Sequence, residues 1–108
     1  MSDHQLPIAC DLSALPDRAQ HEAVATRLLR QTQSVAELTD GYRVAFPVTA
    51  LALAAEFVDG ERRCCPFLDF KILIAPAATA LQLHFTGGEG VKAFLQNALL
   101  PLLPVKPV

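Results

Sequence analysis

Long apolar runs are missing from this 108-residue sequence, although 52% of its residues are hydrophobic. The longest apolar stretches are broken by Glu56, Asp59 or Pro101, and none approaches the roughly 18 residues that a membrane-spanning helix requires. The first residues also lack a positive segment followed by a long apolar run, the mark of a secretory signal. We therefore expect a cytoplasmic protein without membrane contacts.

Charge is also scarce, because only 19% of the residues are Asp, Glu, Lys or Arg, and the formal net charge is −2. The lysines and arginines are scattered, so no basic stripe exists that could neutralise a nucleic-acid backbone. Nucleic-acid binding is excluded on this ground. A chain so apolar for its size is expected to cover part of its surface with a second copy, which predicts a homodimer.

Cysteine is limited to Cys10, Cys64 and Cys65. An odd number cannot close into a complete set of disulfides, and adjacent cysteines pair only through a strained ring. We therefore expect free thiols in a reducing compartment rather than a structural disulfide. The paired Cys-x-x-Cys signature of structural zinc sites is absent, as are a serine nucleophile elbow and a carboxylate pair, so no catalytic residue is assigned.

The periodicity of apolar residues predicts an α+β fold in one domain over residues 1–108. Helical spacing covers about 16–33, 51–65 and 91–100, and alternation typical of strands covers 35–38, 42–46, 70–74 and 81–85. The predicted order is α-ββ-α-ββ-α, as a four-stranded antiparallel sheet with the helices packed on one face. Residues 1–12 are expected to form an extended arm and residues 101–108 an irregular, proline-rich tail.

The pair Asp40-Gly41 stands between two runs of strand-forming residues. Both residue types tolerate a positive φ, which two-residue hairpin turns require at their central positions. We therefore predict a tight hairpin centred on this pair.

The adjacent thiols Cys64 and Cys65 are the most distinctive chemical feature of the chain. They end an apolar helical stripe in which Leu53, Phe57, Glu61 and Cys65 recur every four residues. The neighbouring arginines 62 and 63 favour the thiolate form, whereas the negative end of the helix dipole opposes it. The direction of the pKa shift is left open by these two effects.

Two thiolates suffice for a soft ion such as Hg(II) or Cu(I), whereas As(III) or Zn(II) requires three or four donors. Cys10 is the expected third sulfur beside Cys64 and Cys65. Glu61 is a candidate hydrogen-bond acceptor that supports these ligands, and Arg62 and Arg63 are candidates for tuning their ionisation. The predicted function is therefore binding of a soft metal or metalloid ion.

Two other interpretations use the same residues. In the first, the vicinal pair Cys64-Cys65 is the reactive centre of a thiol redox enzyme, in which one cysteine attacks and the other resolves. In the second, the cysteines are inert packing residues of a dimeric structural or interaction module. His84 is expected to face solvent from a strand, and His4 and His21 receive no role.

The string Glu61-Arg62-Arg63-Cys64-Cys65-Pro66-Phe67, followed by the Thr86–Gly90 segment, resembles a group of small, uncharacterised bacterial proteins. These proteins share a Glu-Arg-x-Cys-Cys-Pro-Phe motif and a later Thr-Gly-x-Glu-Gly segment, and the similarity covers roughly residues 35–97. The resemblance implies a shared thiol site at Cys64 and Cys65, with Cys10, and a link to heavy-metal or metalloid resistance.

Overall fold

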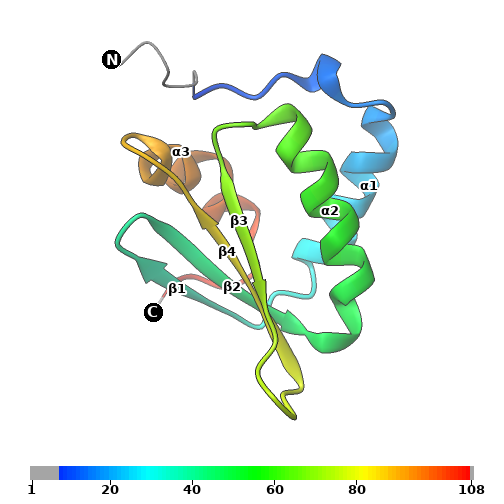
Figure 1. The fold of residues 1–108 in the computed structure, drawn as a ribbon, viewed down its shortest axis with the longest axis vertical. Coiled ribbons are helices and arrows are strands. Elements are labelled where there is room, and N and C mark those ends of the chain that lie inside the picture. Colours follow the sequence, from blue (N-terminus) through cyan, green and yellow to red (C-terminus); the bar gives the residue numbers. More distant parts are fainter. Residues whose placement is uncertain (1–7, 108) are drawn as a thin grey trace.

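A four-stranded antiparallel sheet carries three helices on one of its faces in the computed structural model, which describes residues 8–107 (Figure 1). The strands are β1 (Ser34–Leu38), β2 (Gly41–Pro47), β3 (Asp69–Leu73) and β4 (Ala80–Thr86). The helices are α1 (Arg18–Leu29), α2 (Leu51–Cys64) and α3 (Val91–Ala98). This arrangement confirms the predicted α+β class and the order α-ββ-α-ββ-α.

The strand order β1-β2-β4-β3 places β2 and β4 at the centre of the sheet. Val44 pairs with Leu83 in the antiparallel register, and side chains that alternate along both strands point into the helix layer. Phe46, Leu83 and Phe85 are at most 1% exposed and form the middle of the core. The alternating apolar residues that predicted these strands are therefore the same residues that pack against the helices.

His84 lies on the opposite face of the sheet, in a row with Arg43 on β2 and Lys71 on β3. Its face is the predicted one, but its Nε2 atom is buried and has no hydrogen-bond partner among residues 8–107. Burial lowers the pKa of His84, and the positive charges of Lys71 and Arg43 lower it further. Alternation therefore predicted the face of His84 but not the partial burial of its ring.

The first hairpin forms where it was predicted, but its turn is not centred on Asp40-Gly41. Leu38 pairs with Gly41, so the two turn residues are Thr39 and Asp40, and neither has a positive φ. Gly41 is required for a different reason, because a Cβ atom there would lie 1.9 Å from the carbonyl oxygen of Phe85. Close approach of β4, rather than turn geometry, explains this glycine.

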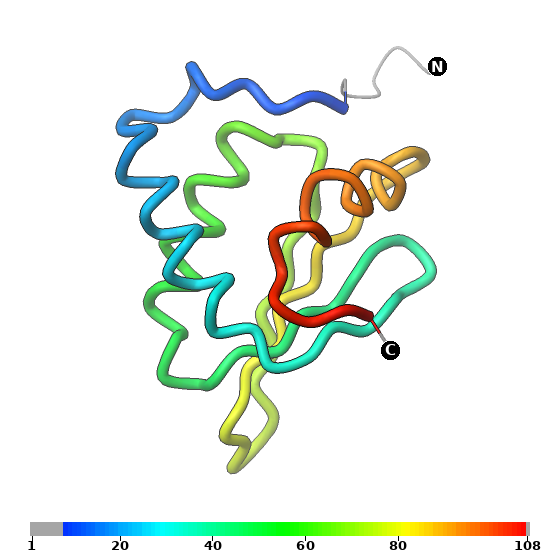
Figure 2. Tube along the Cα trace, turned by 180° about the vertical axis from the view of Figure 1, so that it is seen from behind, coloured from blue at the N-terminus to red at the C-terminus, as the bar shows by residue number. Residues whose placement is uncertain are grey.

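Helices α1 and α2 pack side by side over one part of the sheet, whereas α3 covers the part formed by β2 and β4 (Figures 1 and 2). α1 begins at Arg18 and is capped by Asp17, whose carboxylate accepts a hydrogen bond from the backbone N–H of Gln20. It ends at Leu29, four residues earlier than predicted, because the chain turns there to enter β1. The helix layer is therefore divided into two parts, and the site described below lies between them.

The N-terminal arm crosses the C-terminal end of α2 (Figure 2). Its described part starts at Ile8 without regular structure and continues into a 3-10 turn at Leu12–Ala14, while residues 1–7 of the predicted arm lie outside the described residues. The backbone N–H of Asp11 donates a 2.7 Å hydrogen bond to the carbonyl of Cys64. A carbonyl at a helix end has no partner within its own helix, so this bond both satisfies it and fixes the arm there.

The proline-rich end of the chain begins with a second 3-10 turn, Leu100–Leu102. Leu103 follows in an extended conformation and is only 6% exposed, so it belongs to the core. This segment directly follows α3 and packs against it.

Candidate functional site

The last turn of α2 brings Glu61 and Cys64 to the inner side of the helix. Cys64 is the last helical residue, and Cys65 follows it as the C-cap, with a non-helical backbone conformation, before Pro66. The side chains of Cys64 and Cys65 are buried, at 1% and 2% exposed. Because the helix ends between them, the adjacent cysteines can point toward the same interior region, which a continuous helix would not allow.

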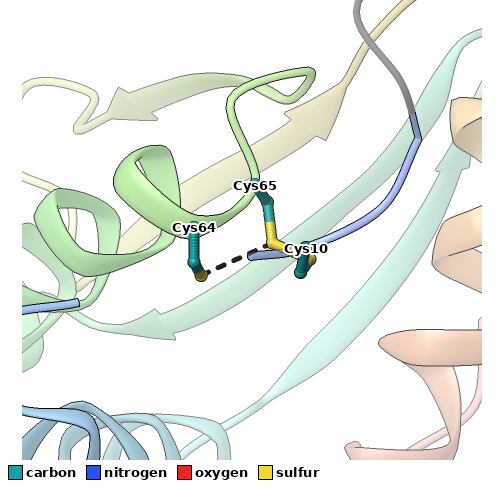
Figure 3. A group of neighbouring side chains, drawn as sticks. All are labelled: Cys10, Cys64 and Cys65. Atoms are coloured by element: carbon teal, nitrogen blue, oxygen red, sulfur yellow. Dashed lines mark hydrogen bonds between the residues drawn. A yellow bond between two sulfur atoms is a disulfide. The ribbon is translucent and has the colours of Figure 1, made fainter. Parts of the chain in front are cut away.

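The three cysteines form one cluster, in which their sulfur atoms all lie within 4.8 Å of one another (Figure 3). Cys10 and Cys65 are joined by a disulfide across 55 positions of sequence. Cys64 keeps a free, buried thiol with its Sγ 3.6 Å from that of Cys65. Cys10 therefore does reach the pair, as expected for a third sulfur.

The expectation of three free thiols is wrong for Cys10 and Cys65. The odd count of cysteines excludes a complete disulfide set but not a single bond with one thiol left over, which is the arrangement found here. The bond depends on the arm crossing the end of α2, a contact that no local sequence pattern encodes.

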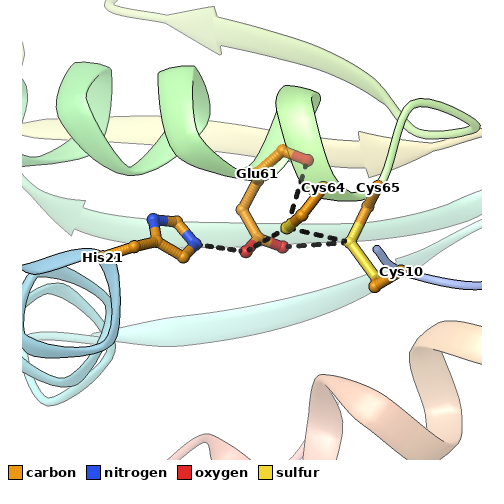
Figure 4. Close-up of a disulfide and its surroundings, with 5 residues drawn as sticks. All are labelled: Cys10, His21, Glu61, Cys64 and Cys65. Carbon is orange, nitrogen blue, oxygen red and sulfur yellow. Dashed lines mark hydrogen bonds and ion pairs between the residues drawn. A yellow bond between two sulfur atoms is a disulfide. The ribbon is translucent and has the colours of Figure 1, made fainter. Parts of the chain in front are cut away.

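Glu61 connects the sulfurs to α1 (Figure 4). Its Oε2 accepts a 2.7 Å hydrogen bond from Nε2 of His21 and lies 3.9 Å from the Sγ of Cys64, whose thiol points to it. Its Oε1 lies 3.9 Å from the Sγ of Cys65. One carboxylate thus touches two of the sulfurs and a histidine, and the predicted role of Glu61 as an acceptor beside the thiols agrees with this position.

Burial raises the pKa of the Cys64 thiol from 9.0 to about 11, and the negative charge of Glu61 adds to the shift. Roughly one thiol in ten thousand is therefore ionised at neutral pH. The sequence left the direction of this shift open between the arginines, which favour the thiolate, and the helix dipole, which opposes it. The shift is upward, and burial is its largest cause.

Arg62 and Arg63 lie on the outer side of α2 and both bind the carboxylate of Asp59. The shorter ion pair joins Arg62 Nη2 to Asp59 Oδ1 at 2.8 Å, and the other spans 3.6 Å from Arg63 Nε. The arginine side chains are 58% and 43% exposed. The structure therefore brings Glu61 to the sulfurs, whereas the guanidinium groups of the predicted tuning residues are engaged elsewhere.

His21 is the site residue that sequence reasoning missed. Its side chain is only 10% exposed, stacks on the ring of Phe57 and binds Glu61, although its place in α1 suggested a surface residue. Gly60 was the available signal, because a Cβ atom there would lie 2.1 Å from Nδ1 of His21. A glycine in the middle of a helix often marks a close approach of a neighbouring element.

An apolar cavity of about 210 Å³ adjoins the sulfurs. It lies between the α1–α2 pair and α3, above β4, and all three cysteines line it together with Glu61. The rest of its described lining is apolar, with Phe57 and Phe85 among the contributing side chains. The thiol cluster is therefore not sealed in the core but opens onto a space that can take a small apolar group.

Among residues 8–107, two overlapping sets of side chains could hold a metal ion. The first is Cys10, Cys64 and Cys65, and the second is His21, Glu61 and Cys64. A thiophilic ion fits the first set because it supplies three soft donors, whereas in the second Glu61 and His21 already bind each other. While the disulfide is closed, only Cys64 can become a thiolate.

The chain matches no protein-family model, and comparisons with curated proteins and with solved structures also find no match. Among residues 8–107, no helix is long and apolar enough to span a lipid bilayer.

Proposed function

We propose that the reduced protein binds a thiophilic three-coordinate ion, with As(III) as the best fit, through the thiolates of Cys10, Cys64 and Cys65. The observation that carries this proposal is the convergence of the three sulfur atoms within 4.8 Å of one another. Hg(II) and Cu(I) are served by two or three of the same sulfurs, whereas Zn(II) requires a fourth donor.

Binding requires that the Cys10–Cys65 disulfide is first reduced. Two equivalents of a small cellular thiol supply the electrons, so that one small-molecule disulfide is released and two protein thiols are formed. The backbone hydrogen bond from Asp11 to the Cys64 carbonyl is a separate contact from the disulfide, and we expect it to hold Cys10 near the helix end after reduction. A reducing cytoplasm, expected from the sequence, would keep the site in its binding form.

Arsenous acid would react with the three thiols so that three As–O bonds break and three As–S bonds form. Each thiol proton leaves with a hydroxyl group, which gives three molecules of water. Glu61 supports this exchange because its Oε2 lies 3.9 Å from the Cys64 sulfur and can accept the thiol proton. The hydrogen bond from His21 orients that oxygen.

The same charge of Glu61 that can accept the proton also keeps Cys64 protonated in the resting protein. We therefore expect Glu61→Gln to lower the pKa of Cys64 and to increase its alkylation rate by iodoacetamide at pH 8. The link to metal resistance that the sequence resemblance implies remains part of this proposal, as does the expected homodimer.

The test is native mass spectrometry of the protein reduced with a phosphine and exposed to arsenite, Hg(II), Cu(I) or Zn(II) in the presence of glutathione. We expect one arsenic per chain, with the mass of an arsenic atom less three hydrogens, and its loss in Cys64→Ser and Cys10→Ser. The unreduced protein is the control and should not bind arsenite. Reduced protein that binds no ion more tightly than glutathione does would overturn the proposal, and the same spectra report whether the chain is dimeric.

A second candidate function is thiol–disulfide exchange, favoured by the 3.6 Å distance between the sulfurs of Cys64 and Cys65. Attack of the Cys64 thiolate on Cys65 would form a vicinal disulfide and release Cys10 as a thiolate, with no net change in oxidation state. The raised pKa of Cys64 disfavours this reaction at neutral pH. Alkylation of the unreduced protein followed by peptide mapping separates the cases, since label at Cys10 supports exchange and label only at Cys64 counts against it.

The absence of any label would favour a third case, in which the buried cysteines are inert packing residues of an interaction module. That case is supported by the small exposure of Cys64 and Cys65.

A further inference from the structure

The cavity beside the sulfurs is larger than a bare ion needs. Its volume is about 210 Å³, and its described lining contains one charged residue, Glu61, next to the cysteines. Three aromatic rings and several aliphatic side chains form the remaining wall, among them Phe57, Phe85, Phe94, Leu29, Leu95 and Leu99. Water in such a space would find few hydrogen-bond partners, so an apolar occupant is favoured.

We propose that the ligand of this site is an organoarsenical, an arsenic(III) centre that carries one apolar substituent such as a phenyl ring. This inference rests on the proposed function and specifies that the arsenic ligand carries an apolar substituent. The arsenic atom would bind the sulfurs, and the ring would occupy the cavity between α2 and α3. An engineered cavity of about 150 Å³ with an apolar lining is sufficient to hold benzene, so the present volume accommodates a phenyl group.

The arrangement of the sulfurs agrees with the valence of such a ligand. A phenylarsonous acid has two exchangeable hydroxyl groups, so it forms two As–S bonds as two As–O bonds break, and it releases two molecules of water. Cys64 and Cys65 are placed to supply both sulfurs, since they lie 3.6 Å apart and both line the cavity. Cys65 becomes available only when its disulfide to Cys10 is reduced.

Two positions on α1 offer a matched pair of variants. Ala25 lines the cavity, whereas Ala23, two residues earlier on the same helix, is exposed and does not. In Ala25→Leu the larger side chain would fill part of the space that a phenyl ring needs, without touching a sulfur ligand. Ala23→Leu adds the same side chain to the same helix and serves as the control.

The experiment measures how tightly the reduced protein binds phenylarsine oxide and methylarsonous acid, each in competition with a small dithiol. Both ligands form two As–S bonds, so their ratio isolates the effect of the substituent. We expect the ratio of the phenyl to the methyl affinity to be about tenfold or more higher for the native protein than for the dithiol. The reason is that the phenyl ring leaves water when it enters the cavity. Ala25→Leu should lose this preference while it keeps the affinity for the methyl compound, and Ala23→Leu should behave as the native protein does.

Each result has a defined meaning. Equal binding of the phenyl and methyl compounds by the native protein overturns the organoarsenical assignment but leaves binding of the ion intact. If neither compound nor arsenite binds, the proposed function itself fails. Loss of the preference in Ala23→Leu, or its survival in Ala25→Leu, would show that the ring does not occupy this cavity. Retained affinity for the methyl compound reports that Ala25→Leu is folded.

Discussion

The two sides of the last turns of α2 differ sharply although their residues alternate in the sequence. On the outer side, Asp59, Arg62 and Arg63 form ion pairs in which every side chain is more than 40% exposed. On the inner side, Glu61 contacts His21 and two sulfurs, and Cys64 is 1% exposed. The contrast between these two sides shows that position around the helix, rather than proximity in sequence, decides which charges act on the thiols.

The outer ion pairs are exposed to water, and solvent screens exposed charges. These pairs therefore contribute little to the free energy of unfolding. The inner groups have lost most of their solvent, so removal of one partner or a change of charge is costly there. Large effects are therefore expected from changes on the inner side and small ones from changes on the outer side. Four predictions test this contrast, in order of decreasing effect.

Opening the Cys10–Cys65 disulfide should give the largest loss of stability. The bond closes a loop of 55 positions, and the chain-entropy relation assigns such a loop about 4 kcal/mol of free energy of unfolding. Urea unfolding of the native protein with and without a phosphine measures this loss. Cys10→Ser should be destabilised in the same way and should not respond to the reductant, and equal urea midpoints for reduced and oxidised native protein would contradict the prediction.

Gly60→Ala should destabilise the protein, although alanine is the better helix former by about 1 kcal/mol. The added Cβ would lie 2.1 Å from Nδ1 of His21, whose ring is fixed between Glu61 and Phe57. Displacing a packed group of this kind costs about 1–3 kcal/mol. Thermal unfolding measures the net effect, with Gly88→Ala as the control because a Cβ there meets no atom of residues 8–107 within 4 Å. A more stable Gly60→Ala protein would show that α1 can move away without cost.

The thiol of Cys64 should titrate near pH 11 in the folded protein, against 9.0 for an ordinary cysteine. A raised pKa in the folded state means that the stability linked to this thiol is fully present below about pH 9 and is lost as the pH rises toward 11. Thiolate absorbance near 240 nm follows the ionisation of the unreduced protein. Subtracting the curve of Cys64→Ala removes the contribution of Tyr42, and a midpoint at or below 9 would contradict the assigned burial.

Arg62→Ala should have the smallest effect, with no measurable change in thermal stability at pH 7 and none in the titration of Cys64. Its hydrogen bond lowers the pKa of Asp59, so whatever stability this pair adds is present above the ordinary value of 3.8 and is lost as the pH falls below it. Melting curves of Arg62→Ala and the native protein at pH 7 and pH 3 test how much stability the ion pair adds at each pH. A clear shift in the Cys64 titration would mean that the arginine does act on the thiol.

Fold class and element order were accessible from sequence because they depend on local periodicity. Alternation around Val44 and Leu83 predicted strands, and the four-residue stripe of α2 predicted which side of the helix is buried. The interpretation of Gly41 was less successful, since its role is defined by the approach of Phe85 from a strand 44 positions later. Local rules located the hairpin but could not identify the reason for its glycine.

The distinction between local sequence patterns and contacts between distant segments also applies to the site. The sequence by itself determined that two thiols stand at the end of an amphipathic helix with Glu61 one turn before them, because helical spacing and Pro66 are local features. Only the tertiary structure decided that Cys10 bonds to Cys65, that His21 binds Glu61 and that a cavity adjoins the sulfurs. The ion pair and the disulfide join residues 40 and 55 positions apart, and the packing of the arm, α1 and α3 around α2 brings the cavity lining together.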